Sequence, residues 1–237
     1  MRQAGFTLIE LMIAIAITAF VLAAIFATYT TQQKSQVVQD QVADMQQNIR
    51  AAMVMMARDI REAGCDPTQK SGAGIVTADV GQIRITRDIA GNPVNPNQED
   101  GDVSDANEDI VFGFNPAVDT DAIPDGVPDT ALVADLCRND VNATNIFNPI
   151  AQNIERVEFN YIDEDGAAIA APITSQADLN RIRAVQISLL VRSSRQDPKF
   201  LNNTAYTTAG GTVWGPFNDS FRRRLSVTTI QCRNKGL

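Results

Sequence analysis

Hydrophobic positions dominate the N-terminal part of the chain. An apolar run extends from Phe6 to Ala27 without a glycine or a proline. As an α-helix this run would be about 33 Å long, close to the ~30 Å hydrocarbon core of a bilayer. A single charged side chain, Arg2, precedes it, and a positive charge before a span favours a cytoplasmic N-terminus. A secretory signal peptide has an apolar core of only about 7–15 residues, so the pattern predicts a permanent membrane-spanning helix over 6–27.

Beyond this run, apolar residues recur every three or four positions as far as Ala63. This spacing predicts an amphipathic helix over 28–63 whose apolar stripe packs against the rest of the protein. No glycine or proline interrupts the pattern, and Gly64 and Pro67 then supply stop signals. We therefore expect one continuous helix, about 87 Å long, over 6–63.

After the helix, the pattern changes from helical spacing to alternation. Five stretches alternate or are rich in β-branched residues, at 81–89, 108–115, 153–166, 183–193 and 222–234. Such stretches are typical of strands in a half-buried, largely antiparallel sheet. The helix stripe can cover the apolar face of that sheet. The predicted fold class is α+β, with a long N-terminal α-helix packed on a largely antiparallel β-sheet head at 64–237.

Composition narrows the possible functions. The chain has 237 residues, a net charge of −8 and no histidine. Nucleic-acid affinity depends mainly on Lys and Arg, so an acidic chain is a poor candidate for nucleic-acid binding. Without histidine, the Ser–His and Cys–His pairs of nucleophilic catalysis are impossible. We therefore expect neither catalytic residues nor an enzymatic activity.

Three cysteines, Cys65, Cys137 and Cys232, lie far apart and form no CxxC motif. This spacing disfavours zinc binding and thioredoxin-type chemistry. If the head lies outside the inner membrane, one disulfide and one free thiol is the simplest expectation. The sequence leaves open which two cysteines would pair.

A strongly acidic region lies in the middle of the chain. No Lys or Arg occurs between Asp88 and Cys137, and we expect an acidic loop insert over about 92–148. Within it, four aspartates lie around a proline and a glycine that favour turns. These are Asp119, Asp121, Asp125 and Asp129.

The four aspartates offer the oxygen ligands that Ca²⁺ takes in sets of about 6–8. They do not form an EF-hand, because a loop starting at Asp121 has Ile123 at its third position and Leu132 at its twelfth. Those positions supply oxygen ligands in an EF-hand, the twelfth a bidentate Glu. Two interpretations remain, a calcium site and a solvated acidic loop without a metal, of which the sequence favours the second. No other cofactor is expected.

The N-terminal residues AGFTLIE place Gly5 before Phe6, with Glu10 as the fifth residue from Phe6. This arrangement resembles the class III signal of type IV prepilins. The resemblance implies that residues 1–5 are a leader peptide. A prepilin peptidase would cut between Gly5 and Phe6 and then methylate the new amino terminus of Phe6.

Glu10 is an acidic residue inside an apolar segment, where a charge is costly. The resemblance implies that Glu10 of one subunit pairs with the Phe6 ammonium of its neighbour during filament assembly. Two opposite charges attract strongly where water is scarce, so each would offset the cost of the other. The alternative is that Glu10 reaches toward the lipid headgroups near the helix start.

Three further stretches resemble segments of PilW-type minor pilins, namely MMARDIREAG, RIRAVQISLLVRSS and FRRRLSVTTIQCRN. The resemblance covers most of the chain except about 92–148. It implies a minor pilin that helps to initiate, prime or cap a type IV pilus. The alternatives are a J-type minor pseudopilin of type II secretion and a pilus-tip adhesin or calcium-binding module.

The same resemblance implies the partners and the location. The partners would be other minor and major pilins, the prepilin peptidase and the inner-membrane pilus assembly platform. Before assembly the protein would cross the bacterial inner membrane once, with its head in the periplasm. After assembly it would lie in the pilus at the cell surface.

Overall fold

The computed structural model describes residues 5, 7–89, 91, 99–143 and 145–235. The chain divides into two compact units, residues 1–43 and residues 44–237. The second is called the head unit below. Helix α1 (Leu8–Glu62) begins in the first unit and ends in the head unit.

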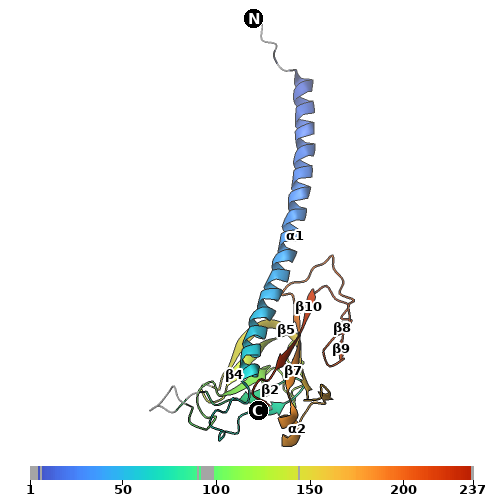
Figure 1. Ribbon diagram of the computed structural model, residues 1–237. Coiled ribbons are helices and arrows are strands. Elements are labelled where there is room, and N and C mark those ends of the chain that lie inside the picture. The colour runs from blue at the N-terminus through green and yellow to red at the C-terminus, as the bar shows by residue number, and fades with distance from the viewer. Residues whose placement is uncertain (1–4, 6, 90, 92–98, 144, 236–237) are drawn as a thin grey trace. The chain divides into compact units, whose positions relative to one another are not determined.

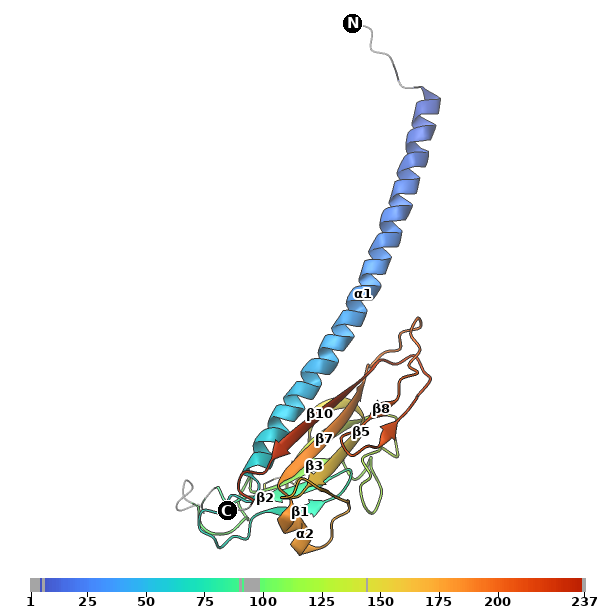
Figure 2. The ribbon, with the colours of Figure 1, turned by 45° about the vertical axis from the view of Figure 1, so that its right-hand side comes forward.

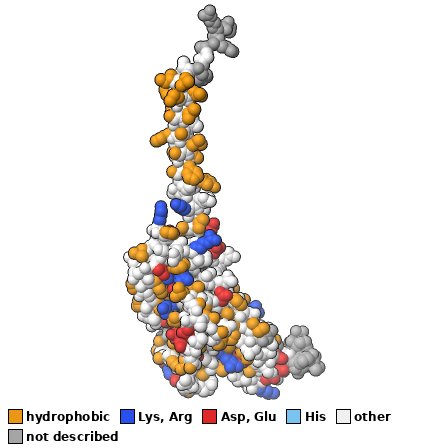
Figure 3. Space-filling view, turned by 180° about the vertical axis from the view of Figure 1, so that it is seen from behind, with side chains coloured by type: hydrophobic (Ala, Val, Ile, Leu, Met, Phe, Trp, Pro, Cys, Tyr) orange, Lys and Arg blue, Asp and Glu red, His pale blue; other side chains and the backbone are white. Residues whose placement is uncertain are grey.

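In the first unit, α1 has no buried face. Every described residue from Thr7 to Tyr29 is exposed, and hydrophobic side chains cover this part of the helix (Figure 3). By length and composition the helix can cross a membrane. The local reason for the helix is an unbroken run of residues without glycine or proline, which continues past the apolar segment.

In the head unit, α1 has one apolar face, as the spacing of three and four predicts. Its buried apolar positions are Met45, Ile49, Ala52, Met53, Met56 and Ile60. This part of the helix lies along one face of the sheet (Figures 1 and 2). Asn48 fixes the contact, because its side chain donates to the backbone carbonyl of Gln152 and accepts from the backbone N–H of the same residue.

The main sheet is antiparallel throughout, with strand order β1-β2-β3-β4-β5-β7-β10 and β6 paired to β5. Its strands are β1 (Ile75–Ala78), β2 (Ile83–Thr86), β3 (Asp109–Gly113), β4 (Ala134–Asp140), β5 (Phe147–Ile162), β6 (Ala168–Ile169), β7 (Ala184–Arg192) and β10 (Arg223–Gln231). A short helix α2 (Gln176–Arg181) precedes β7, and β8 (Tyr206–Thr207) pairs with β9 (Val213–Trp214). The predicted α+β class, a long helix on an antiparallel sheet, is confirmed.

The segment 92–148 is not a single acidic loop. It contributes β3 and β4 to the middle of the sheet, while residues 92–98 and 144 lie outside the described residues. β3 is the strand predicted at 108–115 and is buried at every position. β4 was not predicted from the sequence, because polar residues occupy buried positions of this strand. Asn139 and Asp140 are two of them.

The loop between β3 and β4 folds back onto the sheet. The Gly126 carbonyl accepts from the Val157 N–H of β5 at 3.0 Å, and the Pro124 carbonyl accepts from the Gly81 N–H at 2.8 Å. Gly126 has φ +80°, and a Cβ there would collide with the Val157 carbonyl oxygen. The β1–β2 turn bonds to β5 as well, because the Phe159 N–H donates to the Val80 carbonyl. The sheet therefore curls so that the β1–β2 turn approaches β5. The β3–β4 loop bonds to both of them.

Candidate functional sites

Glu10 lies in the first turn of α1 and makes a reciprocal contact with Thr7. The Thr7 backbone N–H and hydroxyl donate to Glu10 Oε2 at 2.9 and 2.8 Å, and the Glu10 N–H donates to the Thr7 hydroxyl at 3.3 Å. This is a capping box, which satisfies N–H groups that a helix start otherwise leaves unpaired. The T-x-x-E spacing in the sequence is its signal, although the sequence analysis did not use it.

The predicted processing site borders this capping box. Gly5 is exposed, and a Cβ there would meet no atom within 4 Å. Phe6 lies outside the described residues, so cleavage between Gly5 and Phe6, methylation of Phe6 and its pairing with Glu10 stay predictions. Cleavage at that bond would leave Thr7 and Glu10 in the mature chain with their capping box intact.

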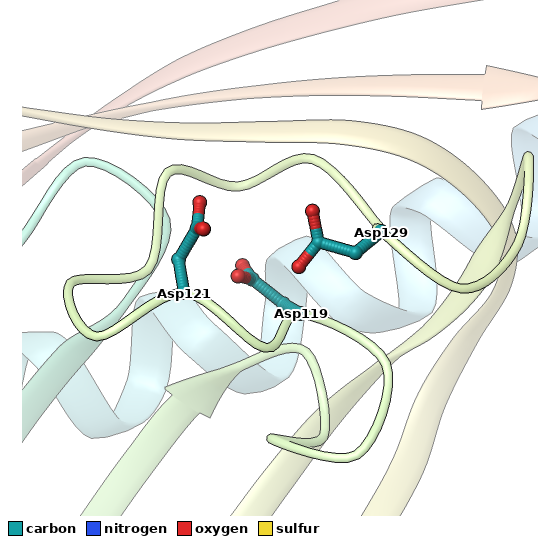
Figure 4. Close-up of side chains that lie close together, drawn as sticks. All are labelled: Asp119, Asp121 and Asp129. Carbon is teal, nitrogen blue, oxygen red and sulfur yellow. The ribbon is translucent and has the colours of Figure 1, made fainter.

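The β3–β4 loop brings together three of the four aspartates predicted as calcium ligands. Asp119, Asp121 and Asp129 each place a carboxylate oxygen within 4.8 Å of the others, as Figure 4 shows. Asp119 is 3% exposed, whereas the other two are exposed. Asp125 is not in this group, and its Oδ1 accepts from the Val127 N–H at 2.8 Å.

Hydrogen bonds hold the three carboxylates to different degrees. Asp129 Oδ2 accepts from the backbone N–H and the hydroxyl of Thr120, at 2.6 and 2.8 Å. Asp119 Oδ2 accepts from the Gly126 N–H at 3.3 Å. Asp119 Oδ1 is buried and has no hydrogen-bond partner within the part of the chain that the structure describes.

The surroundings of Asp119 and Asp121 disfavour the ionised form of their carboxyl groups. Burial raises the pKa of Asp119 above its ordinary value, and the neighbouring charge of Asp129 raises the pKa of Asp121. The hydrogen bonds from Thr120 lower the pKa of Asp129, so that carboxylate stays ionised. None of the ion pairs found among the described residues involves these aspartates.

Several arginines elsewhere in the head unit, among them Arg87, Arg138 and Arg223, are paired with acidic groups. Asp59 of α1 accepts from Arg87 Nη1 at 3.0 Å and from Arg138 Nε at 2.8 Å. Arg223 of β10 is paired with both Glu155 and Asp219, and its guanidinium stacks on the Phe217 ring. In the arginine-rich stretch at the end of the chain, Arg222 and Arg223 thus make internal ion pairs, whereas Arg224 is exposed.

The three cysteines are unpaired in this structure, which differs from the expected single disulfide. Burial raises the pKa of both Cys137 and Cys232 to about 11, and burial also raises the pKa of the partly exposed Cys65. A thiol with a raised pKa is mostly protonated and a poor nucleophile. The geometry therefore offers no activated cysteine among these three.

Comparison with known protein families identifies two regions. Residues 1–26 match the prokaryotic N-terminal methylation motif, and residues 133–234 match the family described as type IV pilus-assembly protein W, or PilW. The chain therefore contains a segment similar to PilW, preceded by a prokaryotic N-terminal methylation motif. Comparison with curated proteins found no match.

Among solved structures, the chain is similar to the type IV-like pilin TTHA1219 from Thermus thermophilus. The two share 14% sequence identity with a TM-score of 0.48. The similarity covers 81% of this chain and 96% of the other.

The two matched regions agree with the motifs singled out from the sequence. The N-terminal match contains Gly5, Phe6 and Glu10, and the PilW match contains β4, β5, β7 and β10. Together they support the general structural role of a pilin-like protein. The N-terminal motif and the exposed apolar helix are consistent with anchoring in a membrane.

Proposed function

We propose that this protein is a minor pilin that helps to initiate, prime or cap a type IV pilus. The observation that carries the proposal is the exposed apolar half of α1 with Glu10 in its first turn. A largely apolar surface of this length is unfavourable in water. Lipid would cover it before assembly, and the helices of other pilins would cover it within a filament.

The geometry of Glu10 supports a contact between subunits. Thr7 holds Oε2 of the carboxylate at the helix start, and no hydrogen bond to Oε1 is found within the described residues. After cleavage, the α-amino group of Phe6 would be mostly protonated, since its ordinary pKa is about 7.7–8.0. Oε1 could then accept from that ammonium on a neighbouring pilin, and methylation would preserve the positive charge.

The capping box gives Glu10 a second role, so the experiment has to separate charge from capping. Glu10→Gln keeps a side chain that suits a capping box but removes the charge. Thr7→Ala breaks the capping box but keeps the charge. Glu10→Ala removes both and should leave membrane insertion intact.

The test is complementation of a deletion strain with each variant, followed by counting surface fibres and measuring the protein in sheared pili and membranes. We expect Glu10→Gln and Glu10→Ala to be inserted in the membrane but at least about tenfold depleted from pili, a loss that corresponds to about 1.4 kcal/mol. Thr7→Ala should be incorporated nearly normally. Normal incorporation of Glu10→Gln would show that subunit pairing does not depend on the charge.

The deletion strain also distinguishes the two machines. Loss of surface fibres is the expected result for a type IV minor pilin. Loss of exported enzymes with fibres unchanged would instead support a minor pseudopilin of type II secretion. Mass spectrometry of the mature protein should find an N-methylated chain that begins at Phe6, consistent with a single-pass inner-membrane precursor and a prepilin peptidase as partner.

A further inference from the structure

We propose that the β3–β4 loop holds a calcium ion between Asp119, Asp121 and Asp129. Ca²⁺ lies about 2.3–2.6 Å from each of its oxygen ligands, so two oxygens on one ion are at most about 5 Å apart. The three carboxylates satisfy this limit, with an oxygen of each within 4.8 Å of the others (Figure 4). The three side chains are therefore close enough to share one ion after a small adjustment of the loop.

A second observation, independent of the clustering, is the state of Asp119. This residue is 3% exposed, and its Oδ1 is buried without a hydrogen-bond partner in the described part of the chain. Buried polar atoms of folded proteins nearly always have a partner, because leaving one unsatisfied costs free energy. Asp119 points toward Asp121 and Asp129 (Figure 4), so an ion between the three would supply the missing partner.

The sequence around Asp119 contains no Lys or Arg that could pair with its buried carboxylate. Lys and Arg are absent between Asp88 and Cys137. Elsewhere in the head unit, buried carboxylates such as Asp59 and Glu155 are paired with arginines. The loop thus concentrates negative charge at a buried oxygen and leaves its neutralisation to a group from solution.

The donor set favours calcium over other metals. All three side chains offer hard oxygen ligands, and the chain has no histidine, which disfavours zinc and copper. Mg²⁺ demands near-ideal octahedral geometry and keeps several waters, whereas Ca²⁺ tolerates irregular sets of carboxylates and carbonyls.

The site would stabilise the closure of the curled sheet. Asp119 Oδ2 accepts from the Gly126 N–H, and the Gly126 carbonyl accepts from the Val157 N–H of β5. Asp129 holds the other side of the loop through Thr120. An ion that fixes Asp119 and Asp129 therefore also fixes the backbone segment that joins the loop to the sheet.

The test uses the full-length protein in detergent micelles, stripped with EDTA, with CaCl₂, MgCl₂ or NaCl added at matched ionic strength. Calcium sites in extracellular modules bind with dissociation constants on the order of 10⁻⁴–10⁻³ M. At about 5 mM Ca²⁺ such a site should raise the Tm by about 2–8 °C. Equilibrium dialysis with ⁴⁵Ca²⁺ should find about one ion per chain at this concentration.

Asp121→Asn is the discriminating variant, because Asp121 is exposed and no hydrogen bond to its carboxylate is found among the described residues. In EDTA it should be at least as stable as the wild type, since it removes repulsion within the cluster. In Ca²⁺ it should lose most of the gain in Tm. Asp165→Asn, which changes an exposed aspartate in the turn between β5 and β6, is the matched control and should keep the full calcium response.

Three results would overturn the proposal. The first is an unchanged Tm and no ⁴⁵Ca²⁺ bound to the wild type. The second is an equal response to Mg²⁺, which would contradict the assignment to calcium. The third is a full calcium response in Asp121→Asn, which would place the ion elsewhere.

Discussion

Asp59 and Asp119 are equally buried, each 3% exposed, yet their carboxylates have different partners. Both oxygens of Asp59 accept from arginines, Arg87 on one side and Arg138 on the other. Asp119 has one oxygen paired with a backbone N–H and one without a partner in the described residues. A buried charge is tolerated only when something neutralises it, so the two sites must obtain that compensation from different sources.

The difference has a structural logic. The Asp59 contacts join α1 to β4 and to the segment after β2, so their compensation is built into the chain. The Asp119 contact holds the β3–β4 loop near β5, and we propose that a calcium ion compensates its charge. Glu10 represents a third arrangement, in which we propose that a neighbouring subunit supplies the positive charge.

The largest expected effect comes from removing the internally compensated carboxylate. Asp59→Ala leaves Arg87, whose side chain is 2% exposed, without one of its two acidic partners. We expect the free energy of unfolding to fall by about 3–5 kcal/mol, measured by chemical denaturation of the full-length protein in micelles. Asp44→Ala, at an exposed position of the same helix, should change it by less than about 0.5 kcal/mol.

Asp119→Ala, measured in EDTA by the same denaturation experiment as Asp59→Ala, tests whether the two carboxylates differ. Because Asp119 has no arginine to leave unpaired, its loss should cost less than half as much as that of Asp59. Equal costs for the two substitutions would contradict the distinction between the two sites.

A second internal ion-pair group should show a comparable but smaller effect with a defined pH dependence. Arg223, whose side chain is 1% exposed, joins Glu155 to Asp219. Arg223→Ala should lower the free energy of unfolding by about 2–4 kcal/mol at neutral pH, because it leaves Glu155 buried without its partner. Arg195→Ala, at an exposed position, is the control and should have little effect.

The pH dependence follows from Asp219. Hydrogen bonds from Arg223 lower the pKa of Asp219 below its ordinary value of 3.8. This contribution to stability is therefore present above pH 3.8 and is lost as the pH falls through the lower pKa of the folded state. The difference between wild type and Arg223→Ala should shrink below pH 3.8, and a difference that grows there would contradict this assignment.

The next effect concerns the backbone that carries the acidic loop. Gly126 and Gly166 both have φ +80°, but only at Gly126 would a Cβ collide with a backbone atom, whereas at Gly166 nothing lies within 4 Å. Gly166→Ala should cost about 1 kcal/mol for the left-handed conformation alone. Gly126→Ala should cost about 2 kcal/mol more and weaken the calcium response, whereas equal costs would show that the loop can move away from β5.

The smallest expected effect is the response of the acidic loop to salt. Repulsion between exposed charges is screened as ionic strength rises. In EDTA, raising NaCl from about 20 mM to about 500 mM should stabilise the wild type by about 1 °C more than Asp121→Asn. An equal response of the two proteins would mean that the three carboxylates do not repel one another.

Patterns along the chain predicted most of the fold. The apolar run and the spacing of three and four predicted α1, because a helical surface repeats every 3.6 residues. Alternation predicted β2, β5 and β7, because successive side chains of a strand point to opposite faces. A short apolar run predicted β3, and β-branched residues predicted β10. β4 was missed because Asn139 and Asp140 are polar yet buried, with hydrogen bonds to Asn145 and Asn107.

The sequence by itself determined the elements and motifs that depend on neighbours along the chain. These include the membrane-length helix, the T-x-x-E capping box and the processing motif before Phe6. The tertiary structure decided which of the four aspartates meet, that Asp119 is the buried one, and that Asp59 rather than Asp119 obtains arginines. The reason is that burial and charge compensation arise between residues far apart in sequence, such as Gly126 and Val157, whose contact no local spacing encodes.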